Sequence, residues 1–187
     1  MKKAFRVLFF VAVIYLIFQG GMLLLKGALF PAKYSNYVVK YSKEYDVNPM
    51  LVMSVMKAES NFNEDAQSKK DARGLMQITG STGTWIAEQL GVKDFNVDML
   101  KEPEVSIKFA CWYLNNLDKE FKNENLVIAA YNAGRGNVKK WLNDNKYSKD
   151  GKNLNYIPFK ETDKYVKKVN AYKNIYTSLY VKGSKFR

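Results

Sequence analysis

A single glutamate, Glu59, stands where a carboxylic acid could serve as a proton donor. It follows Val55 by four residues and Met56 by three, so on a helix its side chain lies at the edge of an apolar face. Removing a carboxylate from water favours the neutral form, raises the pKa and lets the group hold a proton near neutral pH. Such a group suits general acid catalysis on a glycosidic oxygen. A solvated glutamate at a helix end is the alternative, and position alone does not decide between the two.

The composition excludes several other kinds of catalytic site. The chain has no histidine, which excludes Ser-His-Asp and Cys-His nucleophiles, histidine-ligated zinc and the usual base near neutral pH. The one cysteine, Cys111, shares a helical stripe with Ile107, Leu114 and Leu117 and is interpreted as a buried core thiol. The acidic residues lack the spacing of a calcium loop. Chemistry through carboxylates, lysine or tyrosine remains, and no metal or other cofactor is expected.

Several short motifs follow one another along the chain, beginning at Glu59. They are Glu59-Ser60, Ser68, the Gly-Leu-Met-Gln run at 74–77, the Ala-Tyr-Asn-Ala-Gly run at 130–134, and the Pro-Phe-Lys-Glu-Thr run at 158–162 with Tyr165-Val166. Any one of them would be weak support. Together, in this order and at compatible spacing, they resemble the lytic transglycosylase domain of the soluble-lytic-transglycosylase type, which is related in fold to goose-type lysozyme. The resemblance covers roughly residues 34–181.

The resemblance implies a reaction on the glycan strands of peptidoglycan, with Glu59 as the single catalytic acid/base. Glu59 would protonate the β-1,4 glycosidic oxygen between N-acetylmuramic acid and N-acetylglucosamine. It would then deprotonate the muramic 6-hydroxyl, which attacks the anomeric carbon and leaves a 1,6-anhydro end. The acetamido group of the substrate would stabilise the intermediate, so a second carboxylate is not required.

The resemblance also implies which residues contact the substrate. By residue type alone several of these residues have structural alternatives. Ser60 could cap a helix and Ser68 could form a turn, while Met76 and Tyr131 could pack in the core. Glu161 could be favoured by the macrodipole at the start of a helix. In the family reading, Ser60 and Ser68 orient the carboxylate or bind the acetamido group, Met76 and Gln77 line the groove, Tyr131 and Asn132 bind sugar near the cleavage point, and Glu161 and Tyr165 complete the far wall.

The chain departs from the family pattern in several places. Asp71 stands where a glycine is usual, so the turn there is expected to differ unless Asp71 tolerates the local backbone. Gly80 replaces a common proline and loosens the start of the next helix, while Ser106 and Ala110 replace the usual Asn and Gly of a later helix. None of these changes removes a catalytic group, so they bear on substrate preference and loop order.

Other classes of function remain open on the sequence. A lysozyme-type hydrolase would use water in place of the 6-hydroxyl, with Asp65, Asp71 or Glu161 to position that water. A non-catalytic glycan-binding scaffold in the envelope is a second alternative, and the retention of Glu59 with the whole motif set argues against it. The net charge of +12 suits anionic polymers or membrane surfaces. Nucleic-acid binding is not expected, because no helix-turn-helix or RNA-binding signature accompanies the charge. The sequence identifies no protein partner.

An apolar segment precedes these motifs. Residues 7–25 carry no charge and as a helix would span about 28 Å, close to the hydrocarbon thickness of a bilayer. Cleavage after Ala32 is disfavoured, because Phe30 would occupy the −3 position of the cleavage site. We therefore expect an uncleaved, single-pass anchor in the cytoplasmic membrane. The basic residues at positions 2, 3 and 6 favour a cytoplasmic N-terminus and hence an exterior catalytic domain, although basic residues on the other flank pull the opposite way.

Helical periodicity accounts for most of the remaining chain and predicts an all-α, goose-lysozyme-like domain after one transmembrane helix. Helices are expected at 34–46, from Pro49 with one apolar face, from a cap at Ser81 to Gly91, over 103–121, over Glu124–Ala133, and through a last stretch around 165–179. The 103–121 helix is expected to bury Val105 and Phe121 together with Cys111. The predicted domains are the anchor at 1–33, the catalytic domain at 34–181 and a frayed basic tail at 182–187.

Overall fold

The computed structural model describes residues 2–180 and 186, and it divides into two compact units, Met1–Lys33 and Tyr34–Arg187. The first unit consists of helix α1 (Lys2–Leu24), which continues into one π-helical turn, η1 (Leu25–Leu29). Most of its apolar side chains are exposed. Among the residues described, Phe5–Leu29 is the one helix whose length and mean hydropathy of 2.4 would allow it to cross a membrane. The tail predicted at 182–187 lies, apart from Phe186, outside the described residues.

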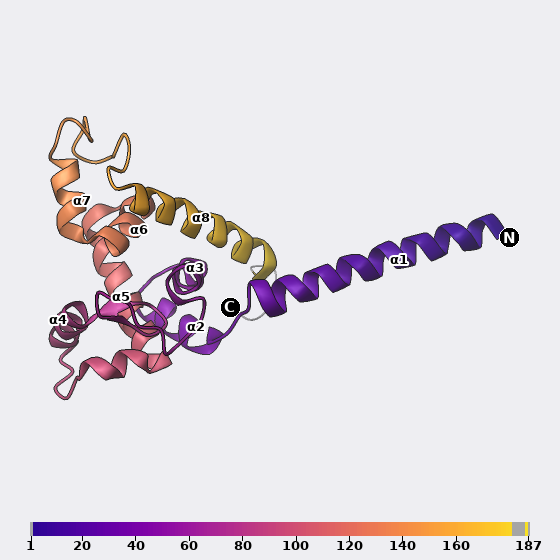
Figure 1. Cartoon of the computed structure of the whole chain (residues 1–187), viewed down its shortest axis with the longest axis horizontal. Coiled ribbons are helices and arrows are strands. Elements are labelled where there is room, and N and C mark those ends of the chain that lie inside the picture. The colour runs from indigo at the N-terminus through magenta and orange to yellow at the C-terminus, as the bar shows by residue number, and fades with distance from the viewer. Residues whose placement is uncertain (1, 181–185, 187) are drawn as a thin grey trace. The chain divides into compact units, whose positions relative to one another are not determined.

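The second unit is a helical domain (Figure 1). The predicted all-α class is confirmed, and the predicted bounds of two long helices, α5 and α6, agree with the structure. In chain order the elements are α2 (Ser35–Glu44), α3 (Pro49–Ser60), β1 (Ala72–Arg73), β2 (Ile78–Thr79), α4 (Gly80–Leu90), the 3-10 helix η2 (Val97–Lys101), α5 (Pro103–Phe121), α6 (Glu124–Ala133), α7 (Arg135–Leu142) and α8 (Lys160–Tyr180).

Helix α3 lies in the middle of this domain and carries Glu59 in its last turn. The side chain of Asn48 caps the helix by accepting a hydrogen bond from the Met50 amide at 2.8 Å, and Pro49 occupies the first helical position. Every residue from Met50 to Met56 is buried. The expectation of a single apolar face is therefore too narrow, because α2, α5 and α8 all pack against α3 and enclose its first turns on every side.

The helices around α3 bring the walls of a site together. Helix α8 packs along α3 and against α6, and α5 packs against α2, α4 and α6 (Figure 1). Cys111 on α5 is completely buried, which confirms its interpretation as a core thiol. Val105 and Phe121 are only half-buried, so their predicted place in the core is wrong; both lie near the ends of α5, where fewer elements cover the helix.

The domain also contains a two-stranded antiparallel sheet that the sequence does not predict. Strands β1 and β2 pair Ala72 with Thr79 and Arg73 with Ile78, and they enclose residues 74–77, hereafter the GLMQ segment. Two residues in each strand are too few to show the alternation of apolar and polar side chains by which strands are recognised.

Helix α4 begins directly after β2. The hydroxyl of Thr79 caps the helix by accepting a hydrogen bond from the Thr82 amide at 3.3 Å, so the predicted cap at Ser81 is wrong by two positions. Gly80 is the first helical residue, so the helix begins earlier in the chain than a cap at Ser81 would allow. At the other end Gly91 adopts a left-handed conformation with φ 67° and ends the helix as predicted.

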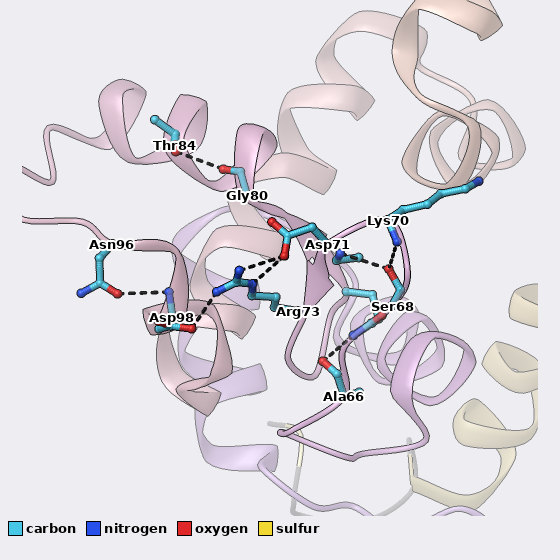
Figure 2. A network of polar contacts seen from close by, with 11 residues as sticks. Ala66, Ser68, Lys70, Asp71, Arg73, Gly80, Thr84, Asn96 and Asp98 are labelled. Atoms are coloured by element: carbon cyan, nitrogen blue, oxygen red, sulfur yellow. Dashed lines mark hydrogen bonds and ion pairs between the residues drawn. The ribbon is translucent and has the colours of Figure 1, made fainter.

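Asp71 keeps the left-handed backbone conformation that a glycine would adopt at its position. Its φ is 60°, a region in which aspartate is one of the better tolerated residues. Its carboxylate accepts two hydrogen bonds from the Arg73 guanidinium, at 3.0 and 2.8 Å, and Arg73 donates a third to Asp98 at 2.6 Å (Figure 2). Asp71 thus tolerates the turn and adds an ion-pair network between β1 and η2.

The GLMQ segment begins with a glycine for a steric reason. Gly74 has φ 72°, and a Cβ atom at this position would lie 1.9 Å from the carbonyl oxygen of Leu100 in η2. No side chain fits without a shift of one backbone against the other. The absence of a side chain at Gly74 therefore allows the segment to lie close to η2.

We expect Gly74→Ala to lower the free energy of unfolding by more than about 3 kcal/mol, because backbone atoms must move. Gly91→Ala is the matched control, since Gly91 has φ 67° but nothing within 4 Å of the added Cβ. The control should cost only about 1–2 kcal/mol, the ordinary strain of a left-handed alanine. Urea unfolding of the full chain in detergent, followed by circular dichroism, measures both. Equal losses of unfolding free energy in the two variants would show that the close approach of Gly74 to Leu100 does not require a glycine.

Candidate active site

Glu59 faces a hollow of about 290 Å³ at the end of α3. Residues of α3, α6 and the first half of α8 line the hollow, and α8 packs against both of the other helices. Several residues that the sequence places in the site, from three helices, are thus brought together. The lining residues are Ala58, Glu59, Asn132, Glu161, Lys164, Tyr165 and Lys168.

The surroundings of Glu59 favour a proton on its carboxyl group. Burial disfavours the charged form and raises the pKa of Glu59 to about 7. Two groups act in the opposite direction: the Tyr165 hydroxyl, which donates a hydrogen bond to Oε1 at 2.6 Å, and the positive charge of Lys168. Because the burial effect is the larger, Glu59 is near half-protonation at neutral pH and can both give and accept a proton.

Side chains from three helices hold the backbone of the GLMQ segment beside Glu59. The Ser60 hydroxyl of α3 donates to the Leu75 carbonyl at 2.8 Å, and the Tyr131 hydroxyl of α6 donates to the Met76 carbonyl at 2.9 Å. The Met76 amide donates to the Ser106 hydroxyl of α5 at 3.2 Å. A buried backbone group without a partner would cost about 1–3 kcal/mol, so each of these bonds stabilises the segment.

Gln77 and Ser68 fold the loop that leads into the same segment. The Gln77 side chain donates to the carbonyls of Ala66 and Gly74 at 2.9 and 3.0 Å. The Ser68 hydroxyl accepts hydrogen bonds from the amides of Lys70 and Ala72 at 3.2 and 3.1 Å (Figure 2 shows the first). The structure therefore places Ser68 in a turn, as its residue type suggests.

The predicted site residues thus divide into two groups. Asn132, Glu161 and Tyr165 line the hollow with Glu59, whereas Ser60, Ser68, Gln77 and Tyr131 make hydrogen bonds to the protein backbone around it. The predicted groove-lining role of Met76 is wrong, because the whole residue is buried with 0% exposure. Met76 instead supports the site through the hydrogen bonds of its amide and carbonyl groups.

Of the three carboxylates that could position a water molecule, one lines the hollow and two do not. Glu161 lines the hollow together with Glu59. Asp71 is paired with Arg73, and Asp65 lies exposed on the loop before β1, so neither is among the lining residues. Asn132, which α6 contributes to the hollow, is oriented by Thr162, whose hydroxyl donates to the Asn132 side-chain oxygen at 2.8 Å.

Two lysines of the hollow, Lys164 and Lys168, were not recognised in the sequence. A signal for one of them is present, because Lys168 follows Tyr165 by three residues and Glu161 by seven, which places all three on one face of a helix. Extending the helical spacing that connects Glu161 with Tyr165 by one more turn would have found Lys168.

A second hollow, of about 460 Å³, is lined in part by aromatic residues. The Arg135 guanidinium lies 5.0 Å from the centre of the Trp85 ring and 6.0 Å from that of Tyr113. The Tyr113 ring lies 5.6 Å from the Tyr131 ring, and Tyr131 is close enough to Glu59 for the Glu59 charge, after burial, to raise its pKa. The residues that line this second hollow are Ser81, Thr82, Trp85, Tyr113, Gly134, Arg135 and Gly136.

The chain belongs to the family described as the Transglycosylase SLT domain, whose model matches residues 36–155. It is 34% identical over 150 residues to the soluble lytic murein transglycosylase of Salmonella typhimurium, and 30% identical over 124 residues to the membrane-bound lytic murein transglycosylase C of Shigella sonnei. It also resembles the solved structure of an inactive mutant of the lytic transglycosylase Slt from Pseudomonas aeruginosa, with a TM-score of 0.72 and 29% identity.

These matches cover most of this chain but a small part of each relative. They span 79% of the chain and 23% of the Salmonella protein, 61% and 34% for the Shigella protein, and 84% and 26% for the Pseudomonas structure. The shared region is therefore the SLT domain, and the relatives contain much that this chain does not match.

The burial of Glu59 also makes folding stability depend on pH. The pKa of Glu59 is about 7 in the folded state against an ordinary 4.5, so the folded state binds more protons between these values. The favourable contribution of the protonated form is complete below pH 4.5 and is lost as the pH rises to about 7.

Glu59→Gln removes this buried charge. We expect the variant to exceed the wild type in free energy of unfolding by up to about 3 kcal/mol at pH 8 and to differ little at pH 4. Thermal unfolding of the full chain in detergent at the two pH values measures the difference. A gain that does not grow with pH would contradict the burial of a charge at this position.

Tyr165→Phe tests the hydrogen bond to Glu59. Because the Tyr165 hydroxyl donates to the carboxylate and favours its charged form, we expect its removal to raise the pKa of Glu59 above 7. Carbon-13 NMR titration of the glutamate carboxyl groups measures the shift. Tyr172→Phe, on the same helix but outside the hollow, should leave the pKa of Glu59 where it is.

Proposed function

We propose that this chain is a peptidoglycan lytic transglycosylase. It cleaves the β-1,4 bond between N-acetylmuramic acid and N-acetylglucosamine and leaves a 1,6-anhydro end on the muramic acid. The observation that carries the proposal is Glu59, a buried carboxyl with a pKa of about 7 at the edge of an open hollow, in a chain of the SLT family. The names of its relatives, lytic murein transglycosylases, support the same reaction.

Glu59 carries both halves of the reaction. Its proton passes to the glycosidic oxygen as the bond from that oxygen to the anomeric carbon breaks. The carboxylate then takes the proton of the muramic 6-hydroxyl, whose oxygen forms the new bond to the anomeric carbon, so no water is consumed. Tyr165 holds Oε1, and no other hydrogen bond to this carboxyl occurs among the described residues, which leaves Oε2 for the substrate.

The glycan strand lies across both hollows in this proposal. Asn132, Glu161 and Tyr165 contact the sugars at the cleavage point, where they line the hollow with Glu59. The aromatic faces of Trp85 and Tyr113 in the second hollow suit the apolar faces of further sugar rings. Ser60, Ser68, Gln77 and Tyr131 act chiefly by holding the loop and the GLMQ segment, and any acetamido contact uses the remaining lone pairs of their oxygens.

A hydrolase is the second candidate, because Glu161 lines the same hollow as Glu59 and could position a water molecule. A non-catalytic glycan-binding domain is less well supported. The burial that raises the pKa of Glu59 costs folding stability at neutral pH and above, and a domain that only binds sugar would gain stability from glutamine at this position.

The first unit provides the membrane anchor in this proposal. Helix α1 and η1 supply an apolar span over Phe5–Leu29, and one relative is named as membrane-bound. The chain crosses the cytoplasmic membrane once, with residues 1–33 as the anchor and the catalytic domain, residues 34–181, on the exterior side. The basic residues ahead of the apolar span favour this orientation.

The proposal is tested by digesting purified peptidoglycan with the full chain in detergent and analysing the soluble products by mass spectrometry. We expect products that end in 1,6-anhydromuramic acid, and a rate lowered by about 10²–10⁴-fold for Glu59→Gln. Asp65→Asn, which alters an exposed carboxylate outside the hollow, should release the same products at the wild-type rate.

Two results would overturn the proposal in different ways. Reducing muramic ends, heavier by one water molecule, would identify a hydrolase and direct attention to Glu161. No release by wild type or variant, in a preparation that still binds the wall, would identify a binding domain.

A further inference from the structure

One lysine of α8 joins the two helices that form the Glu59 hollow. The Lys168 ammonium donates a hydrogen bond to the carbonyl oxygen of Ala58 at 2.9 Å. Ala58 directly precedes Glu59 in the last turn of α3, where carbonyl oxygens lack partners within the helix and carry partial negative charge. Lys168 also lines the hollow itself. The bond therefore holds an ammonium group at the hollow that Glu59 also lines.

The other lysines of α8 are placed differently. Lys167 forms an ion pair with Asp163 on its own helix at 2.7 Å, and Lys173 pairs with Glu124. Lys164 lines the hollow but makes no hydrogen bond or ion pair with any residue that the structure describes. Of the lysines at the hollow, Lys168 is thus the one that the fold holds in a fixed position.

Titratable groups near Glu59 come from every helix that surrounds it. Helix α3 contributes Lys57, whose ammonium donates to Asn61 at 3.0 Å, and α6 contributes Tyr131. Helix α8 contributes Glu161, Lys164, Tyr165 and Lys168. Burial raises the pKa of both tyrosines well above 10, so they stay neutral near pH 7. Among the charged groups, Lys168 is the one whose positive charge favours the ionised form of Glu59.

We propose that Lys168 is a positioning residue for the reaction. It locks α8 to the last turn of α3 and holds a positive charge beside Glu59, and in this way it sets the upper end of the pH range over which Glu59 serves as an acid. The inference rests on the proposed function of Glu59. A carboxyl that must first give up a proton and then accept one works best when the two forms are nearly balanced. Burial alone would hold the proton too firmly, and the ammonium group restores part of the balance.

The test is the pH dependence of kcat/KM for the full chain in detergent, with soluble peptidoglycan fragments as substrate. In Lys168→Met the cation is lost and the apolar stem is kept, so Glu59 retains its proton to higher pH and the alkaline limb should move up by about 0.5–1 pH unit. Lys168→Arg should keep the limb near that of the wild type. Raising the salt concentration from about 0.05 to 0.5 M should move the wild-type limb in the same direction as the methionine variant, because salt screens the charge, and should leave the variant's limb in place.

Two further variants separate the charge of Lys168 from a merely structural role. Lys168→Gln removes the charge but keeps an N–H donor for the Ala58 carbonyl, so it should shift the limb as the methionine variant does. Lys167→Met, the neighbouring lysine paired with Asp163, should leave the limb unchanged. Carbon-13 titration of the Glu59 carboxyl gives the same comparison without turnover and serves for any variant whose activity is low.

The outcomes distinguish this inference from the proposed function. If Lys168→Met and Lys168→Gln lower the rate but leave both the alkaline limb and the Glu59 titration unchanged, Lys168 only supports the fold and the inference is overturned. If Glu59→Gln keeps wild-type activity, the proposed function itself fails. An inactive Glu59→Gln together with shifted limbs in both Lys168 variants supports the two together.

Discussion

The backbone of the GLMQ segment passes through the interior of the domain, where its amide and carbonyl groups need hydrogen-bond partners. Three helices supply them through Ser60, Ser106 and Tyr131, and the lack of a side chain at Gly74 lets the segment approach η2. This requirement also organises the site. Ser60 directly follows Glu59 and Tyr131 directly precedes Asn132, so the side chains that satisfy the segment fix the backbone on either side of the hollow. Several of the motifs therefore consist of the buried GLMQ segment and the residues that bond to its backbone.

The burial of Glu59 affects both its affinity for a proton and the stability of the fold. Its burial keeps a proton on the carboxyl group near neutral pH, and above that range the charged form lowers the stability of the fold. Tyr165 and Lys168 limit this effect without removing it, since both favour the charged form. The proton affinity of the site thus results from a large contribution of burial and two smaller, opposing contributions of α8. Changes on α8 offer a way to alter that affinity without touching the carboxyl group.

The sequence predicts helices well where local chemistry determines their ends. Pro49 starts α3 and Gly91 ends α4 as predicted, because these signals depend on residues close in the chain. Its place on a helix makes Glu59 a candidate but does not decide its role, which is predicted only together with the motifs that follow it. Periodicity predicts which face of a helix is buried, but it does not predict which distant backbone atom a side chain contacts. For that reason the sequence does not reveal that Met76 belongs to the core, or that Lys168 donates a hydrogen bond to Ala58, 110 positions earlier in the chain.

The hydrogen bond between Glu59 and Tyr165 joins residues 106 positions apart, and the partner of the carboxyl group lies on the last helix of the domain. During synthesis, a chain in which α3 but not yet α8 has been made has neither Tyr165 nor Lys168, and one wall of the hollow is missing. A polypeptide that ends before α8 therefore lacks the tyrosine that holds Oε1 of Glu59. The order of the elements along the chain thus delays completion of the hollow until the last helix of the domain has been added.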